Sequence, residues 1–174
     1  MSAISRAGMG GASRCRGSVA AAVALALPAM LVAAGLAVDV GMTVWARAVA
    51  QSAADLAALA GVQELDLDLL ARGERRLMTG PAVARARDVA LRNVIAAGGA
   101  LGPSSAGVDV RVFNVPVGEV FPHPGDGRPM RDPTVCVTVT LRPRLPVLAL
   151  FRGPDTVTAH ADASVLEKKG RGRP

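Results

Sequence analysis

The first third of the chain contains one long apolar run that has no polar face. From Val19 to Val38 only Pro28 and Gly35 are not plainly apolar, and no position in the run is charged. A helix of about 20 residues is about 30 Å long, which matches the hydrocarbon thickness of a bilayer. Inside a bilayer each backbone amide needs a partner within its own segment, and a helix provides one. The pattern predicts a transmembrane anchor over residues 17–38.

Charged and aromatic residues differ between the two sides of this run. Arg14 and Arg16 precede it, whereas the first acidic residue of the chain is Asp39. Because positive charge is retained in the cytoplasm, we expect the N-terminus inside and everything after Asp39 outside. Trp45 and Arg47 then follow where the outer headgroup layer is expected. The predicted location is the cytoplasmic (inner) membrane, crossed once.

A cleaved secretory signal is the competing interpretation of the same run. The small residues of Gly35-Leu36-Ala37 are typical of a cleavage site. The apolar run is, however, longer than the 7–15 residues of an ordinary signal. We therefore favour a retained anchor.

Beyond the anchor the helix is predicted to continue outside the membrane and to end between Leu70 and Gly80, because no proline occurs between Pro28 and Pro81. Gln51 and Asp55, four residues apart, could hydrogen-bond each other or a partner helix, or remain solvated. One face with little side-chain bulk would let another helix approach closely, although an alanine-rich chain also produces such a face by chance. Its members are Ala46, Ala50, Ala53, Ala57 and Ala60.

A second helix is predicted from Pro81 to Ala97, stopped by Gly98-Gly99. Asp88 and Arg92 have a favourable four-residue spacing on its polar side. Its apolar stripe consists of Val83, Ala86, Ala90 and Val94, with Leu91 and Ile95 beside them.

From residue 108 onward the hydrophobic period changes from helical to two. Alternating apolar and polar positions predict strands over residues 108–113, 135–142 and 156–165, with a turn-rich segment at 116–133. Strands with one apolar face require a cover, and the two helices are available. The predicted class is α+β: a long N-terminal transmembrane helix that continues outside, a second helix and a small antiparallel three-stranded sheet, in a pilin-like plan. The apolar segment 143–152 is predicted as a buried connector, with a lip on the membrane surface or a partner contact as alternatives.

Charge and composition exclude some functions. The net charge of +6 suggests nucleic acid, but residues 39–166 carry 13 arginines and 13 acidic residues, so the excess lies at the two ends of the chain. Basic ends beside a membrane serve topology and contact with anionic lipid. We therefore expect no nucleic-acid partner. Aromatic residues make up 2% of the chain, which predicts a core of Val, Leu and Ala.

No constellation of catalytic residues is evident. His123 and His160 have no cysteine or carboxylate at a metal-ligand spacing, Cys136 has no plausible histidine partner, and Asp126-Gly127-Arg128 indicates a turn. Cys15 and Cys136 would lie on opposite sides of the membrane and could not pair. We expect no enzyme activity, no metal site, no cofactor and no small-molecule substrate.

The opening stretch resembles a known family. Arg16-Gly17 before the apolar run, Ala37-Val38-Asp39-Val40-Gly41 after it, and Gln51 to Ala60 (QSAADLAALA) are similar to the N-terminal signature of TadE/TadG-like proteins of the tight-adherence (Flp) pilus assembly system. The remainder is similar only in plan. The matching positions are Asp39, Gly41, Gln51, Ala54, Asp55, Ala57, Ala58 and Leu59.

This resemblance implies a membrane-anchored minor pilin-like subunit that acts by helix packing with other pilus-assembly or secretion membrane proteins. Pseudopilins of this system carry Glu five residues after a cleaved Gly; here Ala22 follows Gly17 at that place, which argues against cleavage by a prepilin peptidase. The expected organisation is a cytoplasmic tail (1–16), the anchor (17–38), an extracytoplasmic α+β domain (39–166) and a basic disordered tail (167–174). The alternative function is a secreted or surface-held small binding domain whose leader is removed.

Overall fold

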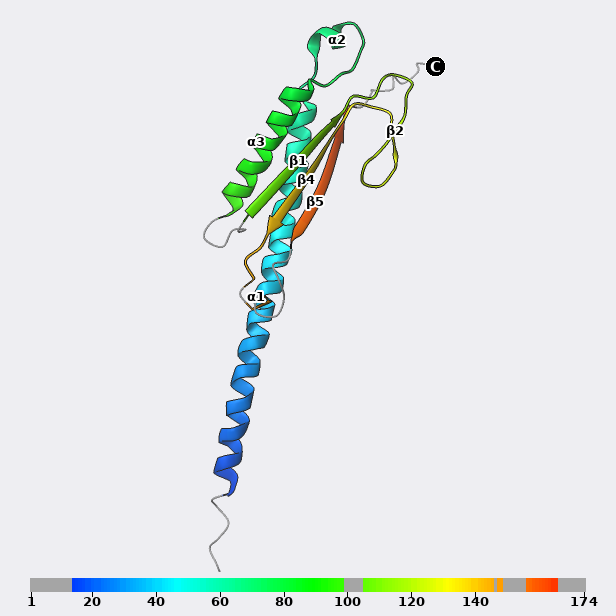
Figure 1. Ribbon diagram of the computed structural model, residues 1–174. Coiled ribbons are helices and arrows are strands. Elements are labelled where there is room, and N and C mark those ends of the chain that lie inside the picture. The colour runs from blue at the N-terminus through cyan, green and yellow to red at the C-terminus, as the bar shows by residue number, and fades with distance from the viewer. Residues whose placement is uncertain (1–13, 99–104, 146, 149–155, 166–174) are drawn as a thin grey trace, which may run out of the picture.

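The computed structural model describes residues 14–98, 105–145, 147–148 and 156–165, and the side chains from residue 19 onward. A single helix, α1 (Arg14–Val62), runs through most of the length of the described molecule. Its C-terminal half is covered by a small α+β head, whereas its N-terminal half projects from the head as a bare rod (Figure 1). The predicted mixed α+β class, with a long apolar N-terminal helix and a small antiparallel sheet, is confirmed.

The sheet of the head has three antiparallel strands in the order β1 (Ser105–Phe113), β4 (Thr134–Arg142) and β5 (Val157–Ser164). These strands are the three that the alternating pattern predicts. The central strand β4 pairs with β1 from Thr134 to Arg142 and with β5 from Thr134 to Leu141. Its inward side chains are fully buried because both neighbours and the helices enclose them: Val135, Val137, Val139 and Leu141.

Two helices cover the inner face of this sheet. Helix α3 (Thr79–Gly98) begins two residues before Pro81, close to the predicted start, and packs beside α1 (Figure 1). Its buried face is a narrow row of small residues: Ala82, Ala86, Ala90 and Val94. Ile95, which we placed beside the apolar stripe, is instead 75% exposed, because it lies on the side of α3 away from α1 and the sheet.

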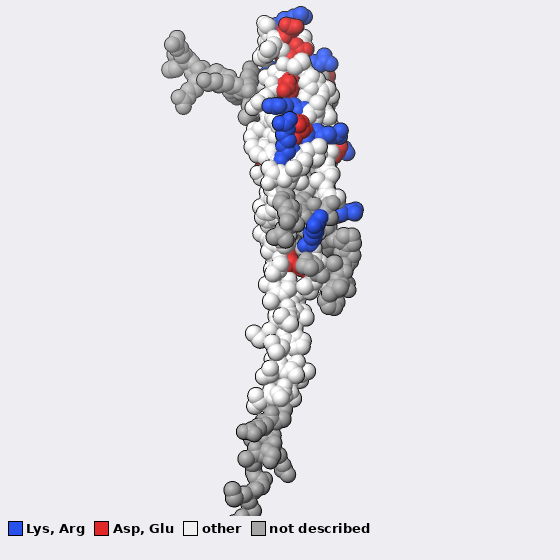
Figure 2. Space-filling model, turned by 90° about the vertical axis from the view of Figure 1, so that its left-hand side faces the viewer, with Lys and Arg blue, Asp and Glu red and all other residues white. Residues whose placement is uncertain are grey.

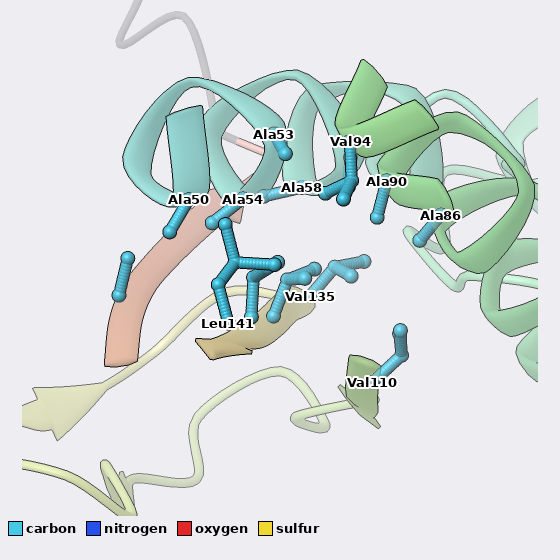
Figure 3. Packing of buried hydrophobic residues seen from close by; sticks show 14 of the residues in the cluster. Ala50, Ala53, Ala54, Ala58, Ala86, Ala90, Val94, Val110, Val135 and Leu141 are labelled. Atoms are coloured by element: carbon cyan, nitrogen blue, oxygen red, sulfur yellow. The ribbon is translucent and has the colours of Figure 1, made fainter. Parts of the chain in front are cut away.

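The alanine face of α1 is used within the chain. Ala46, Ala50, Ala53 and Ala57 are fully buried, and Ala60 is half-buried. Figure 3 shows alanines of α1 and α3 directed toward Leu141 and the valines of the sheet. A Cβ at Gly61 would lie 3.0 Å from Val135 Cγ1, so glycine allows the closest approach here. Small side chains thus let two helices and one strand share a thin core.

The end of α1 differs from our prediction. The helix ends at Val62 and does not continue to the region between Leu70 and Gly80. The chain turns there because Leu65 and Leu77 form an antiparallel bridge and because the Asp66 carboxylate accepts the N–H groups of Asp68 and Leu69, which starts a new short helix, α2 (Leu67–Ala71). This turn returns the chain so that α3 can cover α1.

The turn-rich segment 116–133 contains a small hairpin that the sequence did not predict. It pairs β2 (Phe121–Pro122) with β3 (Pro129–Met130). The Asp126-Gly127-Arg128 turn lies at its tip, and Gly127 has φ +71°, a conformation that favours glycine. The hairpin brings His123 and Asp126 beside the outer face of the sheet.

Candidate functional site

The N-terminal half of α1 is apolar on every side and is almost uncovered. Leu25 is 77% exposed, and nearly every other residue from Val19 to Val38 is exposed as well. Among the described residues, the helix over Val19–Val62 is the one that is long and apolar enough to cross a membrane. Figure 2 shows this length as free of charge, in contrast to the head. A helix that is apolar all round is stable when an apolar medium surrounds it.

Asp39 lies where this apolar length meets the head, and its side chain is 0% exposed. Its Oδ2 atom accepts hydrogen bonds from the backbone N–H groups of Val147, at 3.0 Å, and Leu148, at 2.5 Å. Oδ1 has no partner among the described residues. A carboxylate that accepts two consecutive N–H groups holds a chain segment firmly. Asp39 therefore joins the connector after β4 to helix α1.

Gln51 and Asp55 join α1 to the sheet on the exposed side. The Nε2 atom of Gln51 donates to Asp55 Oδ1 at 2.9 Å and to the carbonyl oxygen of His160, in β5, at 3.2 Å. Of the alternatives that the spacing left open, the structure shows the bond between the two side chains. It adds the contact with β5, which the sequence did not indicate.

The remaining motif positions fall into two groups. Ala54, Ala57 and Ala58 are buried under the sheet and α3. Leu59 is 54% exposed, and nothing lies within 4 Å of a Cβ built at Gly41. The buried group holds the head together, whereas the exposed group leaves one side of α1 accessible.

The residues predicted to mark the membrane boundaries lie at the two ends of the uncovered length. Arg14 and Arg16 are in the first turn of α1, with side chains outside the described part. Trp45 is half-buried and Arg47 is exposed, both within about two turns of Asp39. That these four residues mark the membrane boundaries stays a prediction.

The comparison with protein families matches this same helix. Residues 17–64 match the Tad family model, described as Flp pilus-assembly TadE/G-like. The N-terminal segment is TadE/G-like. The match supports involvement of the chain in Flp pilus assembly and interaction with components of that system. Comparison with curated proteins and with solved structures gives no match.

The TadE/G-like segment contains all eight motif residues that the sequence singled out and ends two residues after α1. Asp39 and Gln51 within it reach the C-terminal half of the chain, at Val147–Leu148 and at His160. These polar positions of the motif therefore act within the chain, where they fix the head to its helix.

Outside the TadE/G-like segment, one cluster corrects our prediction that Cys136 has no histidine partner. Cys136 Sγ lies 3.5 Å from His123 Nε2, and His123 Nδ1 lies 2.7 Å from Asp126 Oδ1. The three residues line a groove of about 460 Å³ on the outer face of the sheet. This cluster could not be predicted from the sequence, because it depends on the β2–β3 hairpin. That hairpin, which was not predicted, folds His123 back over β4.

The electrostatics of this cluster do not favour a nucleophile. Burial raises the pKa of the Cys136 thiol, and the nearby charges of Arg128 and Arg111 oppose that shift without cancelling it. At neutral pH the thiol is therefore protonated, and a protonated thiol is a poor nucleophile.

The carboxylate of Asp126 shows the opposite shift. Desolvation acts to raise its pKa, but the hydrogen bond from the Arg128 N–H and the charge of His123 outweigh it, so the pKa lies below the ordinary value. Among the described residues no group of three or more His, Cys, Asp or Glu side chains could hold a metal ion. The cluster supplies hydrogen bonds that fix the hairpin to the sheet.

Proposed function

We propose that the chain is a single-pass membrane subunit of a Flp pilus assembly or secretion apparatus, with a minor pilin-like role carried out by helix packing. The N-terminus lies in the cytoplasm, residues 17–38 remain in the inner membrane and the α+β head lies outside. The proposal extends the match of residues 17–64 to the Flp pilus-assembly TadE/G-like family.

The main support is the contrast along one continuous helix. The same α1 that is apolar and uncovered up to Val38 is covered by the head from Ala46 onward. An uncovered apolar helix long enough to cross a bilayer is stable there and unfavourable in water. A head fixed rigidly to such a helix is held at a constant distance from the membrane.

The head also contacts the helix on the membrane side of the predicted boundary. Val147 packs against Gly35, and its neighbour Leu148 donates to Asp39. A cleavage near Val38 would remove Gly35 and separate this contact. The contact therefore supports a retained anchor over a secreted head.

The orientation is inferred from charge. Arg14 and Arg16 precede the anchor without any acidic residue, whereas acidic and basic residues are mixed after Asp39. This asymmetry favours a cytoplasmic N-terminus.

The exposed side of α1 in the head is the proposed contact for other subunits. Val40, Val44, Leu56 and Leu59 are all exposed on α1 beyond the anchor. A helix that presents apolar side chains to solvent can pack against a helix of a neighbouring subunit. This role requires no catalytic residue.

Membrane fractionation combined with N-terminal sequencing tests the proposal. We expect the full-length chain in the membrane fraction, resistant to carbonate extraction, with an N-terminus that precedes Arg14. A soluble, folded head with a mature N-terminus near Val38 would overturn the proposal and support the secreted binding domain.

The orientation needs a separate test. In a Cys136→Ser background, Val117, which is 80% exposed in the head, is changed to cysteine. A membrane-impermeant maleimide should label the thiol introduced at this position in intact spheroplasts. The same reagent should reach Cys15 only after permeabilisation, in a Cys136→Ser chain that keeps Val117. Equal labelling of Cys15 before permeabilisation would contradict the orientation.

A further inference from the structure

The connector that follows β4 leaves the sheet and returns to α1 beside the anchor. Pro143 and Leu145 are buried, and Val147 and Leu148 are half-buried beside α1. Figure 1 shows this part of the chain leaving the lower end of β4 and lying next to α1 below the sheet. We call residues 143–145 and 147–148 the lip.

The lip reaches below the predicted membrane boundary. A Cβ built at Gly35 would lie 2.5 Å from Val147 Cγ2, so the valine side chain occupies the space that only a glycine leaves. Gly35 lies four residues before Asp39, which is about 6 Å farther along the helix toward the N-terminus. Val147 therefore lies alongside the uncharged run, about one helical turn inside it.

Asp39 fixes the lip at this depth. Its carboxylate accepts the N–H groups of both Val147 and Leu148, as an N-cap residue does for its own helix, although it belongs to a distant part of the chain. These bonds satisfy two backbone donors that water could not reach in a lipid environment. Val147 and Leu148 are both half-buried, so part of each side chain remains exposed to apolar surroundings.

One basic residue lies within the lip and another lies on α1 toward the head. Arg144 is exposed within the lip itself, and Arg47 is exposed on α1, about two turns beyond Asp39. Figure 2 shows basic side chains just above the uncharged length of the molecule. Apolar residues next to arginines are typical of segments that lie at the boundary between acyl chains and anionic headgroups.

We propose that the lip is a second membrane contact, inserted into the outer leaflet beside the anchor, with Val147 and Leu148 among the acyl chains and Arg144 among anionic headgroups. The inference rests on the proposed membrane anchor. A second contact on one side of the anchor would restrict tilting of the head on its single helix. The lip thus sets the angle at which the exposed side of α1 meets a neighbouring subunit.

Depth-dependent fluorescence quenching tests the lip. The full chain, with Cys15 and Cys136 replaced by Ser, is reconstituted into vesicles of phosphatidylcholine and phosphatidylglycerol (7:3). One fluorophore is attached at Leu148→Cys, Val32→Cys or Val117→Cys, and nitroxide-labelled lipid is the quencher. Val32 lies within the anchor and Val117 lies in the head, so these two positions bracket the result.

A nitroxide placed near the headgroup should quench the fluorophore at Leu148 strongly. This quenching should be at least half as strong as the quenching that a deep nitroxide produces at Val32. Almost no quenching is expected at Val117. Quenching at Leu148 as weak as that at Val117, with Val32 still quenched, would overturn the lip and leave the anchor intact. That result would indicate that the lip contacts protein instead of lipid. Loss of quenching at Val32 would overturn the anchor itself.

Two variants separate the parts of the proposal. Asp39→Ala should lower quenching at Leu148 at least twofold without changing quenching at Val32, because the lip is released while the anchor stays. Arg144→Gln should reduce the extra quenching that phosphatidylglycerol produces over pure phosphatidylcholine, whereas Arg85→Gln, an exposed change on α3, should not. Unchanged quenching in Asp39→Ala would overturn the role of the carboxylate, and equal effects of the two arginine variants would overturn the headgroup contact.

Discussion

The two halves of α1 are built from similar residues and have opposite surroundings. Both are rich in alanine and both are continuous helix, yet residues 19–38 are almost entirely exposed, whereas residues 46–61 bury one complete face. The difference lies in the polar residues. Gln51, Ser52 and Asp55 give the second half an outer side that water can solvate, and the first half has no such side.

This comparison shows that alanine content does not decide what a helix packs against. Where polar residues occupy one side, the alanines on the other side must be covered by protein, and here α3 and the sheet cover them. Where a helix carries no polar residue, as over residues 19–38, it has no side that favours water. Such a helix is stable when its surroundings are apolar on every side. The placement of a few polar side chains therefore distinguishes, within one helix, a half that protein covers from the half proposed as the anchor.

The largest expected effect comes from filling the alanine face. Ala57→Leu should lower the free energy of unfolding of the head by about 1–3 kcal/mol, because the side chain at this position is fully buried between α3 and the sheet. Thermal unfolding in detergent micelles, followed by circular dichroism, should show a Tm lower by about 4 °C or more.

The matched control is Ala33→Leu, on the exposed half of the same helix. It should leave the Tm of the head unchanged, since no protein contact is disturbed there. If both substitutions lowered the Tm equally, the two halves would not differ in packing and the comparison would fail.

A smaller effect is expected from the polar side of the second half. Gln51→Ala removes the hydrogen bonds to Asp55 Oδ1 and to the carbonyl oxygen of His160, and should cost about 0.5–1.5 kcal/mol, toward the low end because the site is exposed. Ser52→Ala, at the exposed neighbouring position, should change the Tm little. Urea titration of both variants measures the difference; equal midpoints would show that Gln51 is only a solvated residue.

The smallest effect concerns the outer face of the sheet. Because burial raises the pKa of Cys136, its alkylation by iodoacetamide in the folded protein should follow a curve displaced to higher pH than in urea. At pH values below the ordinary thiol pKa, this shift contributes fully to the stability of the fold. The contribution is lost as the pH rises toward the raised pKa of the folded protein. Curves that coincide in the folded and the unfolded chain would contradict the burial of this side chain.

If the head packs independently of the medium around the anchor, the Cys136 curve should also be the same in micelles and in vesicles. A curve that moves between the two media would show that the exposed half of α1 influences the packing of the head. That result would show that the two halves of α1 are not independent in their packing.

Much of the architecture could be predicted from periodicity. The three sheet strands and α3 follow directly from patterns of two and of three to four residues, because one buried face is enough to produce each pattern. The end of α1 could not be predicted in this way, since Asp66 and the Leu65–Leu77 bridge compete with helical propensity that continues beyond Val62. Likewise His123 and Cys136 meet only because a short hairpin with no clear pattern folds back on the sheet.

The sequence by itself determined the apolar run, the charge asymmetry around it and the elements that alternate about one face, since each depends on residues close together in the chain. The tertiary structure alone decided which residues form hydrogen bonds with the polar side chains of the TadE/G-like segment. Asp39 meets Val147 and Leu148, and Gln51 meets His160, across more than 100 residues. Contacts over such distances depend on the path of the whole chain, and no local pattern records them.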